Sequence, residues 1–107
     1  MNHNRAYAYI SLCAKAGRLV SGNFAVEKAV KSHAAYLVII SCDASKNTKK
    51  LFDQKCDYYN IPVIYLGDRE LLGKYTGNEM RTSIAVLDKN FAEQIIKSHS
   101  LNDNMEG

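Results

Sequence analysis

The hydrophobic and polar positions of the chain switch repeatedly between a helical period and strand-like runs. Apolar side chains at three- and four-residue steps predict a first helix that ends near Gly17, with a buried stripe of Ala6, Tyr9, Ile10 and Cys13. Residues 18–21 leave room only for a short extended piece. Ser21 is then predicted to cap a second helix, whose inward side chains are Val26, Ala29 and Val30.

Two continuous apolar runs predict buried strands. Residues 36–42 are apolar and rich in β-branched side chains, which is typical of a strand that is covered on both faces and has parallel neighbours. Residues 63–66 form the second run, and Pro62 stands before it, where a missing N–H donor is tolerated. Between the runs, Asp43 and Ser45 are candidate caps for a third helix with an inward stripe of Leu51, Phe52, Cys56 and Tyr59.

The last third of the chain predicts two further helices around a strand. Asp68 caps a short helix over residues 69–75, which Gly77 closes. Residues 82–87 form a strand, and Asp88 caps a final helix that turns Phe91, Ala92, Ile95 and Ile96 inward. From about Ser98 the residues are polar, so residues 99–107 are expected to be a disordered tail.

This order of elements predicts an α/β fold, a three-layer α-β-α sandwich with a small, mostly four-stranded mixed sheet. Residues 1–98 are expected to form one domain. A chain of 107 residues buries enough surface for one such core but leaves little room for a deep substrate chamber.

The net charge of +3 hides an asymmetry along the chain. Residues 1–50 contain eight basic and two acidic side chains, whereas residues 51–107 contain six basic and nine acidic ones. Many of the basic residues fall on the second and third predicted helices and on the loops that start them. Because helix N-termini also attract phosphate, this arrangement predicts an edge that binds anions.

The sequence offers few residue patterns that are typical of catalysis or metal binding. Cys13, Cys42 and Cys56 are widely spaced and are expected to be core thiols, without a zinc site or disulfide framework. No spacing brings His33 or His99 to Cys42 as a nucleophile pair, and neither phosphate-binding nor dinucleotide-binding glycine motif is present. We therefore expect no enzyme, no catalytic residues, no metal and no cofactor.

The sequence also predicts where the protein works. The longest strongly apolar run, residues 34–40, has seven residues, against the roughly 20 that span a bilayer. The unpaired cysteines fit a reducing compartment, so we expect a cytoplasmic protein without membrane contact.

Four stretches, in this order and spacing, resemble the superfamily of kink-turn RNA-binding ribosomal proteins of the L7Ae type, and within it the bacterial YlxQ-like branch. They are the segment 21–30, with its opening glycine and Lys28; the strand 37–40 followed by Asp43; the run 56–63; and the segment 72–77 before the last strand. The resemblance covers residues 5–97, and the family's α-β-α sandwich agrees with the predicted layers.

The resemblance implies RNA binding at two places. The start of the second helix would enter a groove at a sharp bend in RNA, through Gly22, Asn23, Phe24, Ala25 and Lys28. The loop before the last strand would supply a second contact through Glu79, Met80, Arg81 and Thr82. Arg18 and Lys31 are added as basic neighbours of the second helix. The expected RNA is structured and ribosomal or translation-linked; the protein is expected to be a monomer, with possible protein partners in the translation machinery.

Phe24 and Ala25 depart from the family pattern. Kink-turn readers commonly have Asn-Glu at these positions, so strict kink-turn specificity is not expected here. Two roles for Phe24 stay open at this point: it stacks on a splayed base, or it packs under the first helix as a hydrophobic staple. The alternative function is a protein-interaction or scaffold module of the same fold without RNA contact.

Overall fold

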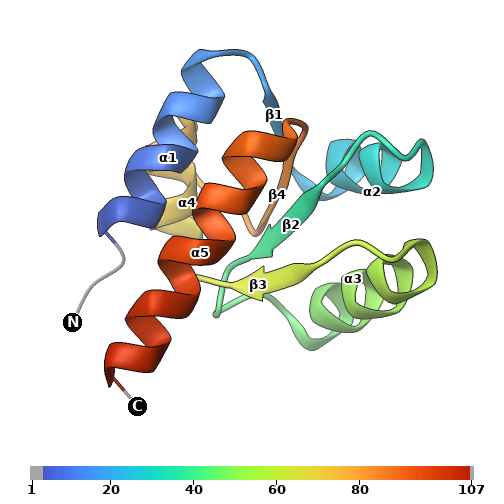
Figure 1. Cartoon of the computed structure of the whole chain (residues 1–107). Coiled ribbons are helices and arrows are strands. Elements are labelled where there is room, and N and C mark those ends of the chain that lie inside the picture. The colour runs from blue at the N-terminus through green and yellow to red at the C-terminus, as the bar shows by residue number, and fades with distance from the viewer. Residues whose placement is uncertain (1–3, 107) are drawn as a thin grey trace.

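A computed structural model describes residues 4–106, which form three layers (Figure 1). The helices are α1 Asn4–Lys15, α2 Asn23–Lys31, α3 Lys46–Tyr59, α4 Arg69–Thr76 and α5 Lys89–Glu106. The strands are β1 Leu19–Ser21, β2 Leu37–Ile40, β3 Val63–Tyr65 and β4 Ser83–Val86.

The four strands form one mixed sheet in the order β1-β4-β2-β3. Strand β4 is antiparallel to both β1 and β2, whereas β2 and β3 are parallel. In this register Ser21 lies opposite Ile84, and Ile40 lies opposite both Ser83 and Tyr65. The carboxyl ends of β1, β2 and β3 therefore meet the start of β4 at one edge, and α2, α3 and α4 follow from that edge.

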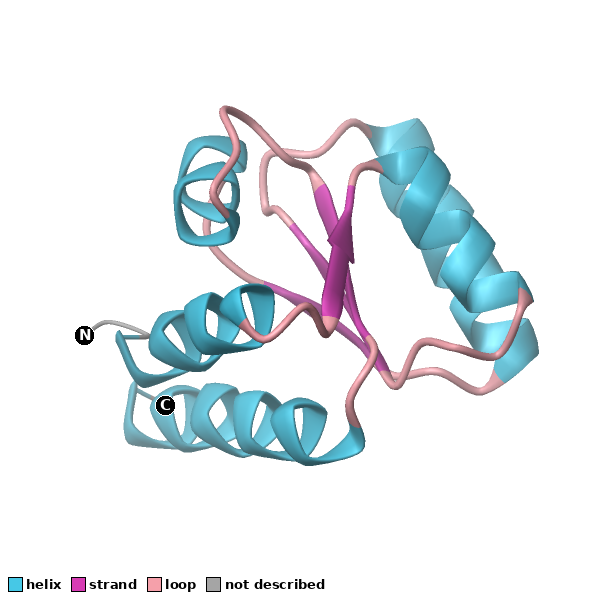
Figure 2. Ribbon diagram, turned by 90° about the horizontal axis from the view of Figure 1, so that it is seen from above, coloured by secondary structure: helices cyan, strands magenta, loops and turns pink. Residues whose placement is uncertain are grey.

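Each face of the sheet has its own hydrophobic core, because successive strand residues point to opposite faces. Figure 2 shows the sheet edge-on between its two groups of helices. One core joins α1, α4 and α5 to the sheet and includes Ile10, Leu72, Ile95, Leu37 and Ile39. The other joins α2 and α3 to it and includes Val26, Phe52, Val38 and Ile40. The predicted three-layer sandwich with a mixed sheet is confirmed.

The helix caps follow the sequence signals in most places. Asp68 accepts a hydrogen bond from the Leu71 N–H at 2.9 Å, and Asp88 accepts one from Phe91 at 3.0 Å. Ser45 caps α3 by accepting from the Thr48 N–H at 3.1 Å. The other candidate, Asp43, instead receives the Arg69 side chain, with 3.2 Å between Nε and Oδ2.

The last helix is longer than the sequence analysis expects. The predicted tail from residue 99 is helical as far as Glu106, while residues 1–3 and Gly107 lie outside the described residues. Two features explain the extension. Residues 89–106 contain neither glycine nor proline. Ser98 is buried, and the Nε2 of His99 lies 3.2 Å from the Tyr65 carbonyl oxygen, so the helix still contacts the sheet beyond its expected end.

The cysteines are only partly as predicted. Cys13 and Cys56 are buried, and this burial raises the pKa of each thiol to about 11. The prediction that Cys42 is a core thiol is wrong, because β2 ends at Ile40 and the Cys42 side chain is exposed in the turn that follows.

Candidate nucleic-acid interface

Two segments about 60 residues apart in the sequence meet at the sheet edge: the start of α2 and the loop between α4 and β4. The Gly22 N–H donates to the Ser83 carbonyl oxygen at 3.0 Å. The hydroxyls of Thr82 and Ser83 both donate to Oδ1 of Asn23, at 3.1 and 2.6 Å. These bonds fix the first turn of α2 against the first residues of β4, and so unite the two predicted RNA contacts.

Helix α2 begins at this edge without a side-chain cap. Gly22 is its N-cap residue, with φ 94° and ψ 143°, a conformation that favours glycine. The N–H groups of the first helical turn have no partners inside the helix, so they are available to an acceptor from outside. The prediction that Ser21 caps α2 is wrong, because Ser21 is the last residue of β1 and its hydroxyl faces the neighbouring loop.

Arg81 fills the space between that loop and β1. Its guanidinium donates three hydrogen bonds: Nε to Ser21 Oγ at 2.9 Å, Nη1 to the Met80 carbonyl oxygen at 2.8 Å, and Nη2 to Asn78 Oδ1 at 3.0 Å. All three acceptors are uncharged. In the part of the chain that the structure describes, Arg81 makes no ion pair. The site therefore holds a positive charge in a fixed position without neutralising it.

Gly73 of α4 packs against the loop between α4 and β4. Its carbonyl oxygen accepts the Asn78 N–H at 2.8 Å. A Cβ added to Gly73 would overlap the Glu79 carbonyl and lie 2.9 Å from the Met80 nitrogen. The loop can approach the helix this closely only because residue 73 has no side chain.

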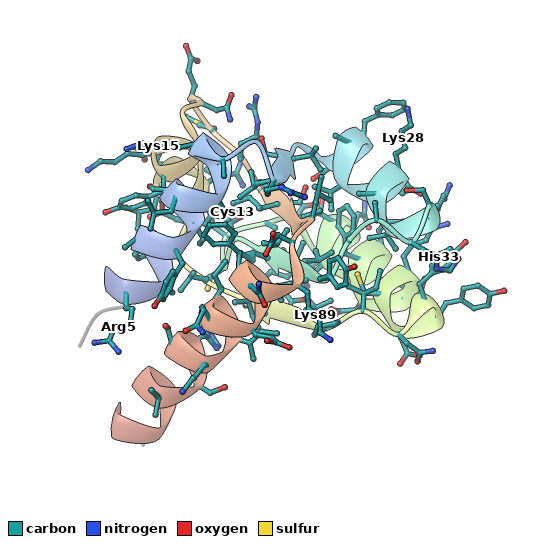
Figure 3. All side chains as sticks on the ribbon, turned by 45° about the horizontal axis from the view of Figure 1, so that its top comes forward. Arg5, Cys13, Lys15, Lys28, His33 and Lys89 are labelled. Atoms are coloured by element: carbon teal, nitrogen blue, oxygen red, sulfur yellow. The ribbon has the colours of Figure 1, made fainter. Side chains whose placement is uncertain are left out.

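Exposed apolar side chains stand on both segments. Phe24 is 84% exposed and Met80 is 57% exposed, so both are open to a ligand. The staple role for Phe24 is therefore excluded. Phe24 and Lys28 line a shallow hollow on α2. Figure 3 shows Lys28 on this helix, away from α1 and α5.

The remaining basic candidates lie farther from the sheet edge. Lys31 ends α2 and pairs with Glu27 at 3.3 Å. Arg18 precedes β1 at the opposite end of the strand, where its carbonyl oxygen accepts the Leu87 N–H at 2.8 Å. The structure therefore separates Arg18 from the predicted site and places Lys31 at the far end of α2, where it lines the same hollow as Lys28. The residues that it brings together are Gly22, Asn23, Phe24, Ala25, Lys28, Glu79, Met80, Arg81 and Thr82.

Sequence reasoning missed the residues that support this site. Ser21 was assigned to the helix cap, and nothing in the sequence around Asn78, Gly73 or Ser83 indicates their contacts. The partners of Ser21 are 57 and 60 residues away in the chain, so no local pattern could have found them.

The described residues form neither a metal site nor a membrane-spanning helix. Among residues 4–106, no group of three or more His, Cys, Asp or Glu side chains is placed to hold a metal ion. The described helices include none with the length and apolar character that crossing a membrane requires.

The fold and the site together define a class of small α-β-α proteins that present a basic, partly apolar surface at one edge of a mixed sheet. Residues 4–96 match the ribosomal protein L7Ae/L30e/S12e/Gadd45 family, and the chain belongs to that family. The predicted family is thus confirmed.

Similar proteins include two relatives called RNA-binding protein YlxQ. The one from Bacillus subtilis (strain 168) is 37% identical over 90 residues, which cover 84% of this chain and 90% of that protein. The one from Enterococcus faecium is 29% identical over 93 residues, covering 87% and 89%.

Solved structures share the architecture. A protein of unknown function from Bacillus halodurans C has a TM-score of 0.87 and 35% identity, covering 90% of this chain and 97% of that one. The Giardia lamblia 15.5kD RNA binding protein has a TM-score of 0.78 and 19% identity, covering 92% and 88%. At this identity the second likeness concerns the fold alone.

Proposed function

We propose that the protein binds structured RNA, ribosomal or otherwise linked to translation, through the start of α2 and the loop between α4 and β4. The observation that carries the proposal is the fixed Arg81 side chain, which lies beside Gly22 and has no ion-pair partner among the described residues. The family of the chain and the names of its YlxQ relatives support the same function.

Each part of the surface offers a different contact. Gly22 lets an RNA backbone approach the open N–H groups of α2, while Lys28 supplies a charge for phosphate. Phe24 offers a face for base stacking, and Met80 offers an apolar surface to an unstacked nucleotide. These contacts suit RNA with a bend or loop better than a regular duplex, whose bases are stacked.

Phe24 is expected to contribute by stacking, which accepts every base. The change Phe24→Ala should weaken RNA binding by about 1 to 3 kcal/mol, or roughly 5- to 150-fold, while leaving the free energy of unfolding nearly unchanged. Titration by fluorescence anisotropy measures the loss. Tyr58→Ala is the matched control, because Tyr58 is also an exposed aromatic residue, at 78%, but lies near the end of α3. Equal effects of the two changes would remove the stacking role.

A gel-shift series tests the proposal itself. The protein is titrated against a kink-turn, a simple stem-loop and a single strand, each at several salt concentrations. We expect tighter binding to the two structured RNAs, without a strict kink-turn preference, and a linear fall of log affinity with log salt of about 0.7 to 0.9 per phosphate contact. Failure to bind any RNA at low salt would reject the proposal and favour a protein partner at the apolar part of the surface.

We also propose a cellular compartment, an oligomeric state and binding partners for the protein. The protein is proposed to act in the cytoplasm as a monomer that works with RNA and with proteins of the translation machinery, without a cofactor or a catalytic role. The buried, unpaired thiols of Cys13 and Cys56 fit the reducing conditions there.

A further inference from the structure

We infer that Ser21 and Asn78 are positioning residues for Arg81, which hold its guanidinium so that two N–H donors face a pair of acceptor atoms on the RNA. The inference rests on the proposed function and names the chemistry of the second contact. The matching ligand group is a planar or bidentate pair of acceptors, such as two phosphate oxygens or the O6 and N7 atoms of guanine.

Arg81 keeps two hydrogen-bond donors free after its contacts within the protein. A guanidinium has five N–H groups, one on Nε and two on each terminal nitrogen. Intramolecular bonds from Nε, Nη1 and Nη2 use three of them. One N–H therefore remains on each terminal nitrogen. Ser21 and Asn78, which are joined by their own hydrogen bond, occupy the Nε–Nη2 side of the guanidinium, so the pair left for a fork with phosphate or guanine is the one on Nη1 and Nη2.

The two partner side chains restrain the guanidinium together. Ser21 Oγ accepts from Arg81 Nε at 2.9 Å and from Asn78 Nδ2 at 3.3 Å, so one hydroxyl joins the strand to both loop residues. Asn78 Nδ2 also donates to the carbonyl oxygen of Thr76 at 3.2 Å. Since Arg81 can only donate and a carbonyl can only accept, the Asn78 amide has one consistent orientation.

The surrounding backbone fixes the arrangement further. The Arg81 N–H donates to the Arg69 carbonyl oxygen at 3.0 Å, and the Asn78 N–H donates to Gly73. A long, flexible side chain is therefore held at both ends before any ligand arrives. Such preorganisation reduces the conformational entropy that binding would otherwise cost.

The side chains that position Arg81 are both uncharged. A carboxylate in place of the Asn78 amide would also accept from Arg81, but it would neutralise the charge and could not donate to Thr76. The amide and hydroxyl oxygens orient the guanidinium and leave the full charge for the RNA. We therefore expect the contribution of Asn78 to affinity to pass through Arg81 alone.

A double-mutant cycle on the full chain tests this. Wild type, Asn78→Ala, Arg81→Ala and the double variant are titrated with the best-bound RNA of the gel-shift series. Arg81→Ala should weaken binding about tenfold or more, Asn78→Ala about three- to tenfold, and the double variant no more than Arg81→Ala alone. Arg81→Lys keeps the charge but not the fork, so it should resemble Arg81→Ala. Lys89→Ala, on α5 at the other face of the sheet, serves as the control.

Thermal unfolding shows whether each variant keeps its stability, and modified RNAs identify the group that Arg81 binds. Ser21→Ala acts on the same hydrogen bonds and gives a second cycle if Asn78→Ala lowers stability. In RNA with methylphosphonate linkages or 7-deazaguanine, the Arg81 effect should disappear where the modified group is the acceptor, which separates phosphate from guanine. Wild-type binding with additive effects of Asn78→Ala and Arg81→Ala would overturn the inference alone. An absence of wild-type binding would overturn the proposed function, and this inference with it.

Discussion

Removal of Lys28 and Arg81 together, as Lys28→Ala with Arg81→Ala, is expected to reduce affinity for structured RNA by about a hundredfold or more. Hydrogen bonds to charged groups contribute about 1.5 to 3 kcal/mol each, and every 1.4 kcal/mol corresponds to a factor of ten. The salt dependence should also become shallower, by the share of one phosphate contact if Arg81 binds guanine and of two if it binds phosphate. Fluorescence anisotropy over a range of salt concentrations measures both effects.

The control removes the same charge elsewhere. Lys89→Ala with Lys97→Ala lowers the net charge by two on α5, which packs on the other face of the sheet from α2. This pair should leave affinity almost unchanged at moderate salt. If both double variants lost affinity equally, binding would depend on total charge and not on the proposed surface.

Gly73→Ala should lower the free energy of unfolding by about 1 to 3 kcal/mol. Alanine normally stabilises a helix relative to glycine, so the expected sign is opposite to the usual one. The reason is the Glu79 and Met80 backbone, which lies against Gly73 and has to move to admit a methyl group. Urea denaturation measures the change, and RNA affinity should fall as well because the displaced loop contains Met80 and Arg81.

Lys74→Ala provides the comparison for Gly73. Lys74 is the next residue of α4 and is exposed, so its replacement should change the free energy of unfolding by less than about 0.5 kcal/mol. An increase in stability on Gly73→Ala would show that the loop yields easily, and would contradict the close support described above.

The architecture could be predicted because its signals are local. The apolar runs before Ser41 and after Pro62 became β2 and β3, and Asp68 and Asp88 cap helices where the sequence indicated. Errors arose where a distant contact decided the outcome. Serine is a residue type that often caps helices, yet the Ser21 hydroxyl accepts hydrogen bonds from Arg81 and Asn78.

The candidate site was predictable only in outline. Family resemblance indicated the two segments, but the sequence could not decide between stacking and packing for Phe24; the structure leaves this side chain in solvent. The sequence also could not show that Arg18 and Gly22 lie at opposite ends of β1. They are close in the chain, but the short strand between them separates them in space. The support from Gly73 depends on a backbone approach that no residue pattern records.

The contact between His99 and the Tyr65 carbonyl lies at an open edge of the sheet. Tyr65 lies on the outermost strand of the sheet, and its backbone groups point away from β2, since Leu66 makes the ladder bond to Ile40. An open strand edge of this kind is a template for aggregation through intermolecular β-pairing. His99 occupies the open carbonyl, and because that oxygen can only accept, its Nε2 carries the proton. The His99 side chain thus covers one backbone acceptor on this open edge, and a truncation after Ser98 is expected to expose it and to increase self-association, which light scattering against the full chain measures.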